Sequence, residues 1–73
     1  MNRLIRFLIR RKLGLKIYER FRFANQRSEN DFYYFGKYAL LKVDGIKGYT
    51  RPANVSLNHL LSRECEIVKV VGI

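Results

Sequence analysis

The sequence predicts an α+β fold, with a small, mostly antiparallel sheet of three to four strands, a basic N-terminal helix and one short helix before the last strand. Apolar residues recur at helical spacing before Gly14 and alternate with polar residues after it. An Asp44-Gly45 pair separates two runs rich in β-forming residues, which is a strong hairpin signal. A short helical segment then precedes a continuous apolar run at 66–73. The expected order is therefore helix, strand, strand, strand, helix, strand.

A helix is expected over residues 2–12. Its apolar positions share one side at helical spacing, namely Leu4, Ile5 and Leu8. Cations occupy the other side at i, i+3 and i+7, namely Arg3, Arg6 and Arg10. Gly14 is expected to end this helix, because glycine readily adopts the left-handed conformation found at helix C-termini.

The segment 15–23 admits two interpretations. Apolar and polar residues alternate along it, which favours a strand. A second helix stays open as the alternative, with an apolar stripe of Leu13, Ile17 and Phe21. The polar residues 25–31 are expected to form a loop.

Residues 32–43 (FYYFGKYALLKV) are dense in β-forming side chains and predict a strand. Asp44-Gly45 then forms a tight turn, because both residues tolerate a positive φ. The returning strand is expected over 46–50, and Pro52 closes it.

The short helix is expected to begin at Ser56, whose hydroxyl can cap it, and Val55 can pack against Leu60 across that cap. Its apolar face consists of Leu57, Leu60 and Leu61. The run 66–73 is apolar on both faces, which is typical of a well-covered strand, and we expect it at the centre of the sheet.

Seventy-three residues form a single small domain, with a basic helix–strand block at 1–27 and a hairpin–helix–strand core at 32–73. Cys65 is the only cysteine, which excludes an intramolecular disulfide and a cysteine-based metal cluster. We expect Cys65 to be an inert, buried thiol. This cysteine usage fits a reducing compartment, and a cytoplasmic protein is expected.

Membrane insertion and targeting are not predicted. No apolar run approaches the ~20 residues that span a bilayer, so no transmembrane segment is expected. The segment 1–15 is rich in arginine but lacks Ser and Thr, so import into an organelle is not favoured.

Charge is concentrated in residues 1–27, which hold nine Lys and Arg against one acid, for a net charge of +8. Residues 28–73 hold six bases against five acids, for a net charge of +1. Clustered like charges repel, so such a block is typical of a protein that meets a polyanion. Arginine outnumbers lysine by seven to two in this block, which favours phosphate, because a guanidinium binds two phosphate oxygens at once.

Aromatic residues interleave with cations between positions 18 and 38, and unpaired bases stack on exposed rings. On a strand, Arg20 and Arg22 would project from the face opposite Phe21 and Phe23. We therefore predict a small nucleic-acid-binding protein that favours RNA, contacts the phosphate backbone and belongs to a ribonucleoprotein such as the ribosome. The predicted contact residues are Arg3, Arg6, Arg10, Arg11, Lys12, Lys16, Arg20, Arg22, Arg27, Tyr33 and Tyr34.

Three other functions fit the sequence less well. A small interaction protein or inhibitor, phage-encoded for example, would dock its basic face on an acidic protein or on a nucleic-acid enzyme. Membrane-surface binding is disfavoured, because eleven residues are short for an interfacial helix. A small ribonuclease would use His59, Arg51 and Tyr49, but the chain carries no motif for catalysis, a cofactor or a metal. No catalytic residue, cofactor or metal ligand is therefore expected.

One short segment resembles a known family. The stretch VDGIKGYTR, residues 43–51, is similar to the V-D-G-x-x-G-x-x-R segment of a large-subunit ribosomal protein family of eukaryotes and archaea that has an SH3-like barrel. The resemblance covers about nine of the 73 residues and does not include the basic block. It implies RNA as the partner.

Overall fold

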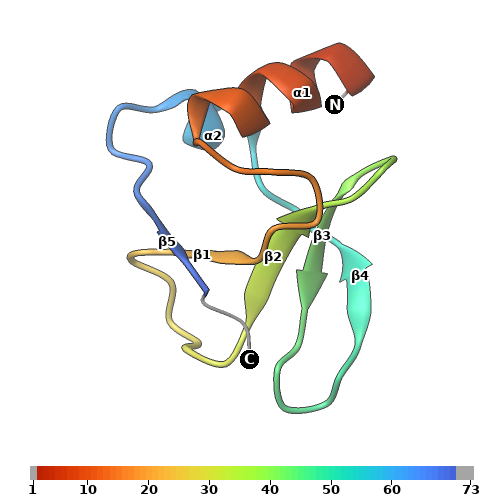
Figure 1. The fold of residues 1–73 in the computed structure, drawn as a ribbon. Helices are drawn as coiled ribbons and strands as arrows, with labels where there is room; N and C mark the ends of the chain where they lie inside the picture. Colours follow the sequence, from red (N-terminus) through yellow and green to blue (C-terminus); the bar gives the residue numbers. More distant parts are fainter. Residues whose placement is uncertain (1, 71–73) are drawn as a thin grey trace.

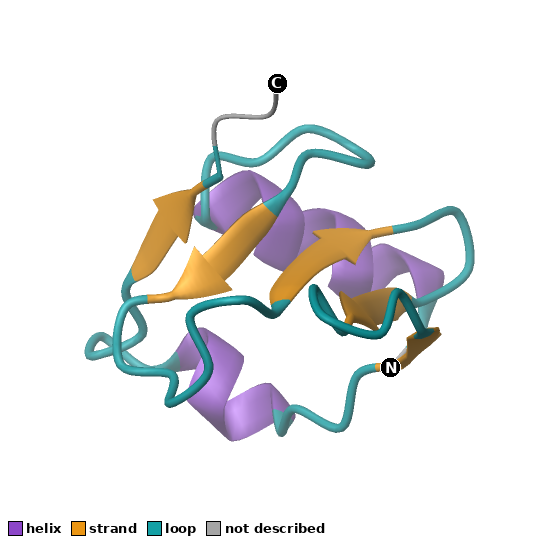
Figure 2. Ribbon diagram, turned by 90° about the horizontal axis from the view of Figure 1, so that it is seen from below, coloured by secondary structure: helices purple, strands orange, loops and turns teal. Residues whose placement is uncertain are grey.

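The computed structural model describes residues 2–70 as a five-stranded sheet with two helices (Figure 1). The helices are α1 (Arg3–Lys12) and α2 (Leu57–Leu61). The strands are β1 (Phe21–Phe23), β2 (Phe32–Phe35), β3 (Leu40–Val43), β4 (Thr50–Pro52) and β5 (Ile67–Lys69). Both helices contribute to the core formed with the sheet, and Figure 1 shows them close together on the same side of the strands, which Figure 2 views from below.

The sheet is antiparallel throughout, with the strand order β4-β3-β2-β1-β5. The α+β class, the N-terminal helix and the short helix before the last strand are confirmed. The predicted number of three to four strands is wrong. Residues 32–43 do not form one strand, because the chain reverses after β2: the Gly36 N–H donates to the Ala39 carbonyl at 2.8 Å, and β3 pairs back along β2.

The loop between β3 and β4 is longer than the predicted two-residue turn. The Asp44 carboxylate accepts hydrogen bonds from the N–H groups of Ile46 and Lys47, both at 2.9 Å, and the Asp44 N–H donates to the Tyr49 carbonyl. These bonds hold 44–49 as a closed loop, with Gly48 at φ +77°. The returning strand therefore begins at Thr50 instead of 46, and Pro52 lies inside it, which an edge strand permits.

The segment after α1 is mostly a turn. The helix ends as predicted, with Gly14 at φ +70°. Residues 16–19 form a turn closed by a hydrogen bond from the Glu19 N–H to the Lys16 carbonyl at 3.1 Å. Only Phe21–Phe23 of the predicted strand 15–23 pairs in the sheet, and the alternative second helix is not formed.

The predicted central position of the C-terminal strand is wrong. β5 lies at an edge of the sheet and pairs with β1, and within residues 2–70 it has no neighbour on its other side. Ile67 packs against the core, whereas Val68 is 45% exposed and Lys69 is also exposed. Residues 71–73 of the predicted strand lie outside the described part of the chain.

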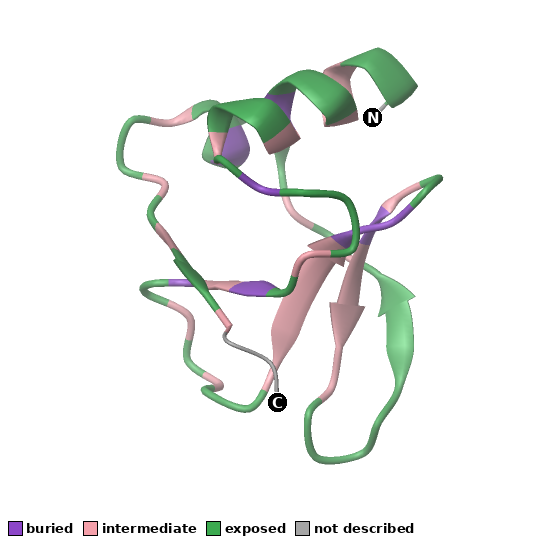
Figure 3. Cartoon of the chain, in the orientation of Figure 1, coloured by how far each residue is buried: buried purple, intermediate pink, exposed green. Residues whose placement is uncertain are grey.

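The core joins both helices to the sheet (Figure 3). Its buried side chains are Ile9, Leu15, Phe21, Phe23, Phe35, Leu40 and Leu60.

The buried side of α1 differs from the predicted one. Spacing of four residues brings Ile5, Ile9 and Leu13 onto the core, and it leaves Leu4 and Leu8 65% and 55% exposed. The predicted Ser56 cap of α2 is confirmed, since its hydroxyl accepts from the His59 N–H at 3.1 Å.

Candidate nucleic-acid interface

Cations from α1 and from the β2–β3 turn meet at a groove, which we call the basic groove. Its volume is about 180 Å³. The residues that line it are Arg3, Arg6, Phe7, Arg10, Ile17, Phe35, Gly36 and Lys37. Four of these side chains are cations, and no lining residue is an acid. The groove forms because α1 lies over the core and the turn after β2 rises towards it (Figure 1).

Three of the four cations of the basic groove form no ion pair with a carboxylate of residues 2–70. Within residues 2–70, Arg3, Arg10 and Lys37 take part in no ion pair, and the pairs Lys42–Asp31 and Lys69–Glu19 lie elsewhere. The Arg10 guanidinium is positioned by a hydrogen bond to the Leu15 carbonyl at 2.9 Å and lies 5.5 Å from the Phe7 ring centroid. Arg3, Arg10 and Lys37 therefore present positive charge that is paired with no carboxylate of residues 2–70.

The other predicted cations are distributed over several surfaces. Arg11 and Lys12 are exposed on α1, and the Lys12 ammonium donates to the Leu60 carbonyl at 3.2 Å. Lys16 and Arg20 flank the 16–19 turn. Arg22 donates to the Glu29 carbonyl at 3.1 Å.

Arg27 lies apart from the basic groove. It belongs to the loop between β1 and β2, which lies at the end of the molecule away from α1 (Figure 1). The predicted contact set therefore does not form one surface.

A second concavity lies on the sheet face that points away from the core, and we call it the outer-face hollow. Its volume is about 370 Å³. Its lining residues are Tyr18, Arg20, Phe32, Tyr34, Val43 and Thr50. The Arg20 guanidinium lies 5.2 Å from the Phe32 ring centroid, and the rings of Tyr18 and Tyr34 are 6.3 Å apart. The hollow thus combines one exposed ring, that of Tyr18, and two half-buried rings with a cation.

Tyr33 and Tyr34 face opposite sides of the sheet, because successive side chains alternate along a strand. Tyr34 lines the outer-face hollow. Tyr33 instead packs on the core side, with its ring centroid 5.9 Å from that of Phe21 and 4.9 Å from that of Phe23. Of the two predicted tyrosines, only Tyr34 therefore lies beside the Arg20 side chain.

The basic groove and the outer-face hollow lie on opposite sides of the end of β2, because successive side chains alternate along a strand. Ile17 lines the groove and its neighbour Tyr18 lines the hollow, while Phe35 lines the groove and its neighbour Tyr34 lines the hollow. A hydrogen bond from the Tyr18 N–H to the Phe35 carbonyl, 2.9 Å long, ties these two segments together. These two backbone segments therefore separate the two concavities.

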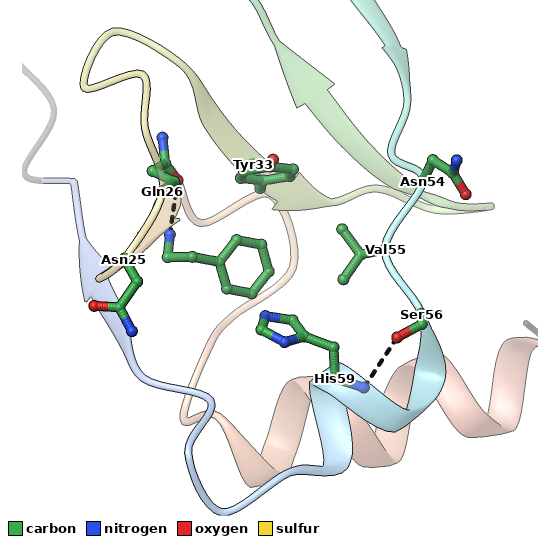
Figure 4. A pocket seen from close by; sticks show the side chains of 8 residues that line it. Asn25, Gln26, Tyr33, Asn54, Val55, Ser56 and His59 are labelled. Carbon is green, nitrogen blue, oxygen red and sulfur yellow. Dashed lines mark hydrogen bonds between the residues drawn. The ribbon is translucent and has the colours of Figure 1, made fainter.

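A third hollow surrounds His59 at the start of α2 (Figure 4). Its volume is about 540 Å³, and the His59 ring packs edge-on against Phe23 at 5.3 Å. The Gln26 amide beside it is engaged in the β1–β2 loop, where it accepts from the Phe23 N–H and donates to the carbonyls of Ser28 and Asp31. Arg51 and Tyr49 do not line this hollow, so the ribonuclease set suggested by the sequence is not assembled there.

Cys65 and the acidic residues supply no further site. The Cys65 side chain is half-buried against the core, and burial raises the pKa of its thiol, which keeps it protonated at neutral pH. Within residues 2–70, no group of three or more His, Cys, Asp or Glu side chains could hold a metal ion.

Lys37, Tyr18 and Phe32 line these concavities but are missing from the predicted contact set. Lys37 follows Gly36 in residues 32–43, which predict a single strand. The turn that brings Lys37 near α1 is not predicted, because β-forming residues lie on both sides of it. Tyr18 and Phe32 belong to the aromatic residues that interleave with cations between positions 18 and 38, and this interleaving is the sequence feature that could have identified them. The pattern alone does not show which of those rings stay exposed.

No family model, curated protein or solved structure matches the chain. The segment 43–51 forms the end of β3, the following loop and part of β4. None of the helices formed by the described residues has the length and apolar character needed to cross a bilayer.

Proposed function

We propose that this chain binds nucleic acid, and RNA in particular, through phosphate contacts in the basic groove, as a component of a ribonucleoprotein such as the ribosome. The observation that carries the proposal is the convergence of Arg3, Arg6, Arg10 and Lys37 on one groove with no acid among its lining residues. Guanidinium groups bind phosphate oxygens in pairs, and counterions released from the nucleic acid then favour the complex.

RNA is preferred because folded RNA presents unpaired bases beside its phosphates. The outer-face hollow carries the exposed ring of Tyr18 and the half-buried rings of Phe32 and Tyr34, and aromatic side chains stack on unpaired bases. A duplex would offer phosphates to the groove but no free base to the hollow.

The proposal is tested by neutralising two cations in the basic groove. Arg3→Gln combined with Lys37→Gln removes two charges from it, and Arg27→Gln combined with Arg63→Gln removes two exposed charges elsewhere. Surface substitutions of this kind change stability little, so both variants are expected to fold. The affinity for a structured RNA, measured by fluorescence anisotropy at fixed salt, should fall at least about tenfold for the groove variant and about twofold for the control. Equal losses in the two variants would contradict the proposal.

A protein partner is the second candidate, supported by the apolar side chains exposed on α1. Leu4 and Leu8 lie among its arginines and have no cover. Such a mixed surface also fits an acidic protein that carries apolar contacts. Affinity capture from extract with and without nuclease separates the two functions, since partners retained after nuclease treatment point to protein and partners lost point to nucleic acid.

A further inference from the structure

We propose that the outer-face hollow binds one unpaired base of single-stranded RNA, stacked against Tyr18 and Tyr34. This inference rests on the proposed function, because the strand that supplies the base would pass around the end of β2 and place its phosphates in the basic groove. It names the conformation of the RNA, which the basic groove alone does not specify.

The composition of the hollow suits a base and its sugar. Phe32, Tyr34 and Val43 supply apolar surface, and among the described lining residues Arg20 supplies the only charge and none is an acid. Within residues 2–70, Arg20 forms no ion pair, so its guanidinium can meet the phosphate next to a bound base.

Three hydroxyl groups line the same hollow without using their hydrogen-bonding capacity. Within residues 2–70, the hydroxyls of Tyr18, Tyr34 and Thr50 have no hydrogen-bond partner in the protein. A ribose offers a 2′-hydroxyl that donates and accepts, whereas deoxyribose does not. The hollow therefore favours RNA over DNA.

The backbone of Tyr18 points independently to a role for its ring. Tyr18 is the only residue other than glycine in 2–70 with a positive φ, at +65°, and it stands at the third position of the 16–19 turn. Glycine is the residue that suits such a position, and a bulky residue there is strained. The ring is 57% exposed and meets only Tyr34 among the aromatic side chains of the described chain, so burial does not account for its presence.

The test uses Tyr18→Gly, which removes the ring and relieves the backbone. Three probes carry the same sequence: a single-stranded oligoribonucleotide with one 2-aminopurine, the matching DNA strand and the RNA duplex. The wild type should quench the 2-aminopurine fluorescence and bind the RNA strand more tightly than the DNA strand. Tyr18→Gly should lose the quenching and weaken single-strand binding about five- to fifty-fold, with duplex binding unchanged.

The matched control is Tyr49→Ala, which removes a ring that is 66% exposed and lines neither concavity. It should leave all three affinities unchanged. Tyr34→Phe keeps stacking but removes one hydroxyl, and the preference for RNA over DNA should fall about three- to tenfold. Urea unfolding of Tyr18→Gly should show a stability equal to or above that of the wild type, so a loss of binding cannot result from unfolding.

Several results would overturn the inference. They are unchanged single-strand affinity in Tyr18→Gly, unquenched 2-aminopurine with the wild type, and equal binding of the RNA and DNA strands. If these occur while the wild type still binds the RNA duplex through Arg3 and Lys37, the inference fails and the proposed function stands. If the wild type binds none of the probes, the proposed function itself fails.

Discussion

Asp44 organises the β3–β4 loop through its charge. Its carboxylate accepts hydrogen bonds from the N–H groups of Lys47 and Ile46, and these bonds lower the pKa of Asp44 below its usual value. A carboxyl with a lowered pKa stabilises the folded chain above its unfolded pKa of about 3.9. That contribution is lost as the pH falls through the lower folded pKa.

Asp44→Asn should therefore reduce the pH dependence of stability. The amide keeps an oxygen acceptor for the loop but cannot titrate. The free energy of unfolding of the wild type, measured with urea, should fall as the pH is lowered from about 5 to about 2, and that of Asp44→Asn should fall less over the same range. Identical pH profiles for the two proteins would show that this carboxylate contributes nothing through its charge.

The sequence indicates which types of residue form the candidate site, but not always which side of the sheet each side chain faces. Arg20 and Tyr34 could be predicted because alternation along the strand sets them apart from the buried Phe21 and Phe35. Residue type does not separate Tyr33 from Tyr34, whereas the same alternation does, and the predicted contact set includes both because it does not apply alternation to residues 32–35. The placement of Tyr33 on the core side depends on the register of β1 with β2, in which Phe21 lies opposite Tyr33.

At the scale of elements, two loops support each other. Asp31, at the end of the β1–β2 loop, accepts a hydrogen bond from the Gly45 N–H at 3.4 Å and pairs with Lys42 at 3.6 Å. A Cβ atom at Gly45 would overlap the backbone carbonyl of Asn30. The two loops can pack this closely only because Gly45 has no side chain.

Gly45→Ala should separate these loops and destabilise the fold by about 1–3 kcal/mol, the usual cost of forcing an added methyl into a packed contact. Lys47→Ala, on the exposed side of the same loop, should change stability by no more than about 0.5 kcal/mol. Urea unfolding of both variants checks the expectation. Equal stability of Gly45→Ala and the wild type would mean that the close approach is not required.

Element types were easier to predict than their pairing. The helix over 2–12 and the Ser56 cap follow from local spacing and capping chemistry, and both are found. The hairpin within 32–43 was missed because β-forming side chains on both sides of Gly36 conceal the turn. The edge position of β5 could not be inferred from its apolar residues, because edge or centre is decided by which strands the rest of the chain provides.

At the scale of the whole molecule, net charge and small size act together. A 73-residue chain with a net charge of +9 has a small core and a surface that repels itself. Part of that repulsion arises between the cations that line the basic groove, where α1 faces the β2–β3 turn. A polyanion bound there would relieve the repulsion, so binding and folding stability should rise together.

The salt dependence of RNA binding tests the central claim most directly. If about six phosphates are neutralised by the basic groove and its neighbouring cations, the logarithm of the association constant should fall against the logarithm of salt concentration with a slope of about −4. The slope should be measured by anisotropy for the wild type between low and physiological salt. A slope near −4 is the predicted result, and an affinity that barely changes with salt would contradict phosphate binding by this groove.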